Sequence, residues 1–361
     1  MRKLPAAVRI VVFVAALYVF FLSIELLADG FKGLGTGFAR TLFTLTATPV
    51  AGLFVGILAT AVCQSSSSTT SIVVGLVACG TLDIAHAIPI VMGANIGTTV
   101  TNTLVSLAHV TRRQEFERAF PASIVHDMFN LLSVAVLLPL EIWFSPLSRS
   151  SAWLARLFHG VGGLKFASPL KLATAPVGNL LSHVLGGIAP LALVVALILL
   201  FLSLKLMVDS MKSLISRRVE MVVDKYLFGN AARAFFVGLL FTVLVQSSSA
   251  TTSIVVPMAG AGLLTLRQIF PYTLGANIGT TVTACLAALV TGSAGAVQIA
   301  FAHLLFNVFG TAVWYPLRIV PIAMAQWWGG FCARRRTFAM LYVIVVFYAI
   351  PVVAVILLRR H

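Results

Sequence analysis

Two polar runs of nearly identical sequence stand inside an otherwise apolar chain. The first, QSSSSTTSIVVG, covers residues 64–75, and the second, QSSSATTSIVVP, covers residues 246–257. Each run offers several hydroxyl groups and one amide group. Polar groups without partners in an apolar environment cost several kcal/mol each, about the value of a hydrogen bond there. The two runs are therefore expected to line a cavity or to bind a ligand.

The residue types in these runs suit a small anion. Serine is a preferred N-cap residue, and the N-terminus of a helix presents unpaired N–H groups and a partial positive charge. If two such helix starts meet, their N–H and O–H donors surround a small tetrahedral oxyanion. Neither run contains an arginine, so helix dipoles and bound cations are expected to offset the charge. The predicted anion ligands are Gln64, Ser65, Ser66, Ser67, Gln246, Ser247, Ser248 and Ser249.

A second repeated block follows each serine run. GANIGTTVTNTL begins at Gly93 and GANIGTTVTACL at Gly275, with the same 182-residue spacing as the serine runs. Sodium takes hard oxygen ligands, such as hydroxyls, amide oxygens and the carbonyls of unwound helices. The alternative is that glycine, threonine and asparagine only permit close helix packing, but two copies beside serine runs favour a site. The predicted sodium ligands are Asn95, Thr98, Thr99, Thr101, Asn277, Thr280, Thr281 and Thr283.

Histidine and asparagine recur four residues apart later in each repeat. His126 with Asn130 and His303 with Asn307 each share one face of a helix. An interhelical hydrogen bond is the preferred interpretation. The alternative is a pair that lines the site or responds to protonation, or that supports the ligand-binding residues without contacting the ligand. Asp127 also lies in an apolar segment, where carboxylates usually serve function, but its counterpart in the second repeat is a leucine.

The composition indicates a membrane protein with many spans. The 361 residues are 60% hydrophobic and 10% charged, and the mean hydropathy is +1.03. The net charge of +15 could indicate nucleic-acid binding, but the cations lie in short connectors between apolar segments. The positive-inside rule explains that distribution better, so no nucleic-acid partner is expected.

The duplicated motifs predict the architecture. We expect an all-α polytopic membrane protein with two inverted-topology repeats, each with a serine-rich helical hairpin and a GANIGTT helix broken near the middle of the membrane. The predicted units are residues 1–144 (first repeat), 145–183 (extracellular connector), 184–317 (second repeat) and 318–361 (connector and terminal membrane helix).

Basic residues predict the orientation. The connectors 111–118 and 212–233 are rich in lysine and arginine and are expected in the cytoplasm, with residues 145–182 outside. Asp209 is expected to anchor a helix end at the membrane interface. The last helix, 338–358, is left open, because counting spans places its end outside whereas Arg359 and Arg360 favour the cytoplasm.

These residues resemble the type II sodium-phosphate cotransporter family. The resemblance rests on both QSSS runs, both GANIGTT blocks and the segment RRQEFERAFPASIVHDMFNLLSVAVLLPLE from Arg112, and it covers nearly the whole chain. It implies that the QSSS hairpins form the transport path for phosphate, through Gln246 and Ser247–Ser249 in the second repeat. It also implies that Thr280 and Thr283 help bind sodium and that both termini lie in the cytoplasm.

The resemblance implies a transporter rather than an enzyme. It implies a symporter that couples the entry of sodium, the coupling ion, to the uptake of inorganic phosphate. No cofactor is expected, and the protein is expected to lie in the lipid bilayer. We expect a multi-pass protein of the plasma membrane. As a bacterial-type member of the family, it is expected in the bacterial inner membrane. Sulfate or arsenate as the oxyanion, and a passive anion channel, are alternatives. An intramembrane serine hydrolase is disfavoured because no GxSxG motif is present. The sequence leaves the oligomeric state open, a dimer included.

Overall fold

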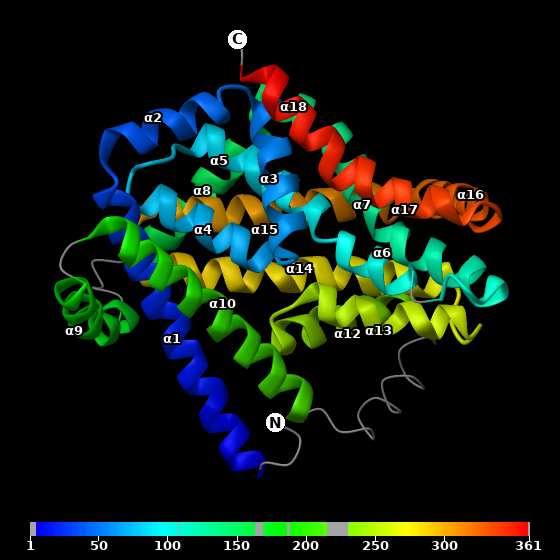
Figure 1. Ribbon diagram of the computed structural model, residues 1–361, viewed down its shortest axis with the longest axis horizontal. Coiled ribbons are helices and arrows are strands. Elements are labelled where there is room, and N and C mark those ends of the chain that lie inside the picture. Colours follow the sequence, from blue (N-terminus) through cyan, green and yellow to red (C-terminus); the bar gives the residue numbers. More distant parts are fainter. Residues whose placement is uncertain (1–4, 108, 163–168, 186–187, 215–229, 360–361) are drawn as a thin grey trace.

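The chain forms a bundle of helices in a computed structural model that describes residues 5–107, 109–162, 169–185, 188–214 and 230–359 (Figure 1). No strand occurs among these residues, which confirms the all-α prediction. The helices up to residue 184 are α1 (Ala6–Gly33), α2 (Gly35–Leu45), α3 (Pro49–Cys63), α4 (Ser66–Ala78), α5 (Ile84–Gly97), α6 (Val100–Leu107), α7 (Arg113–Phe144), α8 (Pro146–Gly162) and α9 (Pro169–Val184). The later ones are α10 (Ala189–Leu214), α12 (Ala231–Val245), α13 (Ser248–Gly260), α14 (Leu266–Thr291), α15 (Ala294–Trp314), α16 (Ile319–Arg334), α17 (Arg336–Ile344), the π-helical turn η1 (Val345–Ala349) and α18 (Ile350–Leu358).

Seven stretches in the described part of the chain are long and apolar enough to cross a membrane. They are Ala6–Gly33, Ile84–Leu107, Arg113–Phe144, Ala189–Met207, Leu266–Thr291, Ala294–Trp314 and Arg336–Leu358. A spanning helix needs about 20 residues. The helices of the serine-rich hairpins have only 13 or 15 residues, so each hairpin is too short to cross and return.

The duplication seen in the sequence is a duplication of structure. Helices α3 and α12 both have 15 residues, and α4 and α13 both have 13. The halves also interlock in the same way, because α7 packs against α13 and α16, while its counterpart α15 packs against α4 and α8. The paired first helices, α1 and α10, run side by side along one flank (Figure 1).

The GANIGTT helices are held by close backbone contact. A Cβ atom at Gly93 would collide with the carbonyl oxygen of Leu53 on α3, and one at Gly275 would collide with that of Phe235 on α12. Gly279 is less tight but still close, since its Cβ would lie 2.6 Å from the carbonyl oxygen of Leu239. These glycines therefore allow α5 and α14 to approach the hairpins far more closely than larger residues would.

The predicted break in these helices occurs in only one repeat. In the first repeat, Thr98 and Thr99 separate α5 from α6. In the second, α14 runs without interruption from Leu266 to Thr291, so the prediction of a broken helix is wrong there. The physical reason is that glycine serves two purposes, unwinding and close packing, and here packing against α12 keeps the helix intact.

The segment predicted as a connector between the repeats is largely helical. Glu141, at the end of α7, caps the start of α8 by accepting hydrogen bonds from the N–H groups of Leu147, at 2.7 Å, and Ser148, at 3.1 Å. Helix α8 then packs on α15 of the other repeat. Of the predicted basic connector 212–233, residues 215–229 lie outside the described residues, as do Arg2, Lys3 and Arg360.

The terminal segment is one apolar rod with a π-helical turn. Pro351 lacks an N–H group, and its ring would clash with the carbonyl of residue 347 in a regular α-helix. The turn Val345–Ala349 widens the helix at this point, and the Ile350 N–H group bonds to the carbonyl of Val345. The helix predicted over 338–358 is therefore confirmed, with a widened middle.

Candidate functional site

Both serine runs begin a helix after the same unusual backbone turn. Gln64 and Gln246 have left-handed conformations with φ of 53° and 58°, which few residues other than glycine adopt. This turn makes the next serine the N-cap of α4 or α13. Ser65 Oγ accepts a hydrogen bond from the N–H of Ser68, and Ser247 Oγ accepts one from that of Ala250, both at 3.2 Å. The two helices thus begin with the same N-cap hydrogen bond, and the first has one more, from Ser68 Oγ to Ser65 Oγ.

The two helix starts open on one cavity of about 220 Å³. It lies where α4, α13 and α10 meet, and all eight predicted anion ligands line it. The cavity receives the donors of two helix N-termini, each with a partial positive charge. The arrangement can therefore hold a small anion in a ring of N–H, O–H and amide groups.

Helix α10 adds charged residues that the sequence analysis did not assign to the site. Lys205 and Asp209, four residues apart, line the cavity beside the apolar side chains of Phe201 and Leu204. Asp209, predicted as an interfacial anchor, therefore lies at the cavity. The sequence signal for a role of Lys205 at the site was a lysine inside an apolar span. The equivalent position in the first repeat is Glu25.

The two glutamines differ in their bonding. Gln246 is buried, and its side chain accepts a 2.7 Å hydrogen bond from Thr283 while donating to the carbonyl of Val243. Gln64 is exposed to the cavity. Thr101 occupies the position equivalent to Thr283, and its buried hydroxyl has no partner among the described residues. Among the described residues, a side-chain hydrogen bond between the glutamine of a serine run and the GANIGTT block of the same repeat therefore occurs in the second repeat only.

Most of the threonines predicted to bind sodium bond to their own helix. The hydroxyls of Thr98 and Thr280 donate to the carbonyls of Ala94 and Ala276 at 3.0 and 3.1 Å, and Thr99 and Thr281 make similar bonds. These hydroxyls keep free lone pairs, so the bonds leave them able to accept a cation. None of the four lines the anion cavity, but Ser249, which does, donates to the backbone carbonyl of Thr98 at 3.4 Å, so the first GANIGTT block lies directly beside the cavity.

A buried polar cluster joins the two repeats. His126 Nε2 lies 2.8 Å from Asn277 Oδ1, and in the reciprocal pair His303 Nε2 lies 3.3 Å from Asn95 Oδ1. The interhelical bonds preferred for the histidines are therefore confirmed. Reciprocal contacts of this kind arise between two equivalent units related by a two-fold axis.

The asparagines complete this cluster. Asn307 Nδ2 donates a hydrogen bond to Asn95 Oδ1 at 3.1 Å. This bond and the contact from His303 together occupy both lone pairs of the Asn95 oxygen. Asn130 receives a 2.9 Å hydrogen bond from Asn277 and donates to the backbone carbonyl of Asn95 at 2.8 Å. In this conformation the side-chain oxygen of Asn95 serves the contact between repeats rather than a cation.

Asp127 is fully buried beside the cluster. Its Oδ2 atom accepts hydrogen bonds from the Tyr342 hydroxyl at 3.1 Å and from Thr103 at 3.4 Å. Its Oδ1 atom has no partner among the described residues.

A further link, missed by the sequence analysis, joins Asn102 on α6 to Thr252 on α13 at 2.8 Å. The polar spacing TNT around Asn102 was the only signal for it.

Comparison with known proteins gives a consistent result. The family model of the Na⁺/Pi-cotransporter matches residues 19–167 and 199–325. The chain is 34% identical to sodium-dependent phosphate transport protein 2A of Rattus norvegicus, over 93% of this chain and 65% of that protein. It is 32% identical to sodium-dependent phosphate transport protein 2B of Homo sapiens, over 95% and 64%.

This chain thus spans slightly less than two thirds of the length of these relatives. No solved structure matches it. The match of the family model covers well over half of the chain and includes both serine runs and both GANIGTT blocks. The chain belongs to the Na⁺/Pi-cotransporter family.

Proposed function

We propose that this protein is a secondary transporter that couples sodium entry to the import of inorganic phosphate. The observation that carries the proposal is the convergence of two helix N-termini, with all eight predicted ligands, on one cavity of about 220 Å³. Pockets for organic ligands typically measure about 300–1,000 Å³, so this cavity suits a small oxyanion better. The relatives named above are described as sodium-dependent phosphate transport proteins.

Charge balance explains why sodium is needed. Phosphate carries between one and two negative charges near neutral pH, and Lys205 is accompanied by Asp209 at the cavity. The helix dipoles and one lysine beside a carboxylate leave part of the charge uncompensated. Sodium ions held by the GANIGTT threonines, Thr280 and Thr283 first among them, supply the rest. The two ligands then bind with positive cooperativity, and each raises the affinity for the other by the same factor.

The path across the membrane follows from the duplicated frame. The reciprocal histidine–asparagine contacts support a two-fold relation between the repeats, and we place that axis in the membrane plane, so that the repeats have inverted topology. The site then lies near the middle of the bilayer, and rocking of one repeat against the other exposes it to each side in turn. The plasma membrane, in a bacterium the inner membrane, is the proposed location.

Uptake of phosphate into proteoliposomes tests the proposal. The full chain is reconstituted, and labelled phosphate is offered with an inward sodium gradient, with equal sodium on both sides, and with potassium in place of sodium. We expect accumulation above equilibrium only with the gradient. Uptake that never exceeds equilibrium would indicate a channel, and stronger competition by sulfate than by unlabelled phosphate would reassign the substrate.

A further inference from the structure

A second cavity, of about 570 Å³, lies apart from the anion site between α7, α16, α17 and η1. Its ten lining residues are aromatic or aliphatic, apart from the methionines Met128 and Met324. Two of them, Trp327 and Leu341, are 73% and 44% exposed, so the cavity opens on the outer flank of the terminal helix. The terminal segment also exposes the side chains of Ile344 and Ile356, as expected of a surface in contact with lipid. The cavity has the lining and the volume for a hydrocarbon tail.

The wall of this cavity holds a polar group that lacks a partner. The indole of Trp328 lines the cavity, with its ring 5.3 Å from that of Phe331 and 5.9 Å from that of Tyr342. Its Nε1 atom is buried and has no acceptor among the described residues. A buried N–H donor without an acceptor is unfavourable. Protein atoms cover this nitrogen, so a ligand in the cavity contacts the apolar part of the indole.

Three exposed arginines lie at one end of the cavity. Arg334 ends α16, Arg335 forms the turn, and Arg336 begins α17. Arg336 is two residues from Phe338, which lines the cavity, so about 3 Å along the helix axis separates them. Within the described part of the chain, no acidic residue forms an ion pair with any of the three. Basic groups beside transmembrane helices on the cytoplasmic side bind anionic lipid head groups.

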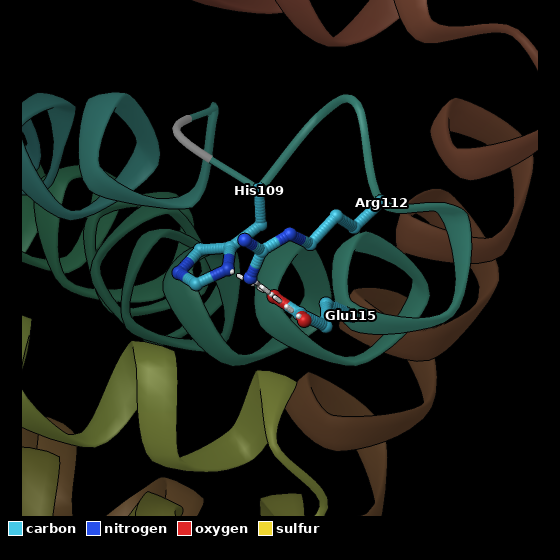
Figure 2. Close-up of polar contacts among 3 residues, drawn as sticks. All are labelled: His109, Arg112 and Glu115. Carbon is cyan, nitrogen blue, oxygen red and sulfur yellow. Dashed lines mark hydrogen bonds and ion pairs between the residues drawn. The ribbon is translucent and has the colours of Figure 1, made fainter.

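The other basic turn of the structure differs in this respect. Glu115 accepts hydrogen bonds from Arg112 at 3.1 Å and pairs with His109 Nδ1 at 2.9 Å (Figure 2). Arg113 is paired with Glu117 at 3.0 Å. These arginines are therefore compensated within their own turn, and they provide a matched control for the unpaired group.

We infer that the cavity between α7, α16 and α17 binds one anionic glycerophospholipid. The acyl tail fills the cavity and packs on the indole ring of Trp328, and the phosphate group lies against Arg334–Arg336. Tyr342 forms part of the cavity wall and also donates to the buried carboxylate of Asp127. The bound tail therefore holds in place the side chain that connects the terminal helix to the polar core.

Native mass spectrometry of the purified full chain tests this site. The delipidated protein is mixed with equal amounts of phosphatidylglycerol and phosphatidylcholine, and the retained lipid is counted. We expect one phosphatidylglycerol per chain. The triple variant Arg334→Gln/Arg335→Gln/Arg336→Gln should lower its affinity on the order of a hundredfold, about fivefold for each arginine. The double variant Arg112→Gln/Arg113→Gln should retain the lipid like the wild type.

A second measurement does not depend on the charges. Phosphatidylglycerol with brominated acyl chains should quench the fluorescence of the wild type more strongly than that of Trp328→Phe, which keeps the aromatic wall. Equal retention of both lipids, equal loss in both arginine variants, or unchanged quenching would each overturn the inference. So would a dimer that retains no lipid, because a second copy of the chain would then cover the cavity.

Discussion

The residues with the clearest individual roles are the serines that begin α4 and α13. Ser66 and Ser248 are buried at equivalent places in the cavity wall. We expect Ser66→Ala or Ser248→Ala to weaken phosphate binding about ten- to a hundredfold, because a hydrogen bond to a charged group is worth about 1.5–3 kcal/mol. Phosphate affinity is measured by uptake, and membrane insertion by surface labelling. Unchanged affinity in both variants would place the anion elsewhere.

Lys205 gives a prediction about charge. We expect Lys205→Met to raise the apparent Kd for phosphate by roughly five- to tenfold, less than a buried partner would, because an exposed cation is screened by solvent. Lys205→Arg keeps the charge and should retain most of the affinity. Lys32→Met removes a lysine on α1 that does not line this cavity, and it should change nothing. Similar defects in both methionine variants would show a general effect of net charge.

Thr280 gives a prediction about coupling. Thr280→Val removes the hydroxyl but keeps the shape, so apparent sodium affinity should fall and the phosphate defect should shrink as sodium rises. Thr273→Val is the matched control, since this buried threonine on α14 also donates to its own helix, to the carbonyl of Ile269 at 2.7 Å. Phosphate affinity is measured across a sodium titration. A phosphate defect that persists at saturating sodium would make Thr280 a direct ligand of the anion.

At the scale of helices, the backbones approach most closely between each hairpin and its GANIGTT helix, that is, between α3 and α5 and between α12 and α14. Gly275→Leu forces a side chain against the carbonyl of Phe235, and overpacking of this kind costs about 1–3 kcal/mol. We expect a clear fall in the thermal unfolding temperature of the detergent-solubilised protein. Gly330→Ala on α16, where a Cβ atom meets nothing within 4 Å, should be neutral or slightly stabilising. Equal Tm values for the two variants would contradict the close contact.

The hairpins show how far sequence patterns predict these elements. The change from ILATAVC to QSSS locates the end of α3 at Cys63, because a polar run cannot continue an apolar helix without partners. The course of α14 could not be predicted in the same way. Gly275 and Gly279 are equally compatible with an unwound helix and with a tightly packed one, and the backbone of α12 opposite them decides between the two.

At the scale of the whole molecule, the duplicated spacing was sufficient to predict that two distant runs converge on one site. It could not predict Lys205, since its place at the cavity depends on how α10 is rotated against α4 and α13. Nor could it predict the bond between Tyr342 and Asp127, which requires the terminal helix to pack beside α7.

The orientation of the two repeats is open to direct measurement. We expect a cysteine introduced at Ser150 to react with a membrane-impermeant reagent added outside, and one at Ser216 to react only from the cytoplasmic side, because lysine and arginine gather near the second position. The four native cysteines are replaced first. Equal reaction from outside at both positions would rule out inverted repeats.

The unequal bonding of the two glutamines has a consequence for energetics. The side chain of Gln246 accepts a hydrogen bond from Thr283, whereas within the described part of the chain the exposed Gln64 and the equivalent Thr101 hydroxyl have no hydrogen-bond partner. If the two repeats exchanged these roles, a hydrogen bond between Thr101 and Gln64 would form as the bond between Thr283 and Gln246 broke. The number of hydrogen bonds would not change. The two end points of the exchange would then lie close in free energy. A carrier needs that balance, since a deep minimum at either end would slow the return of the empty protein and limit its turnover.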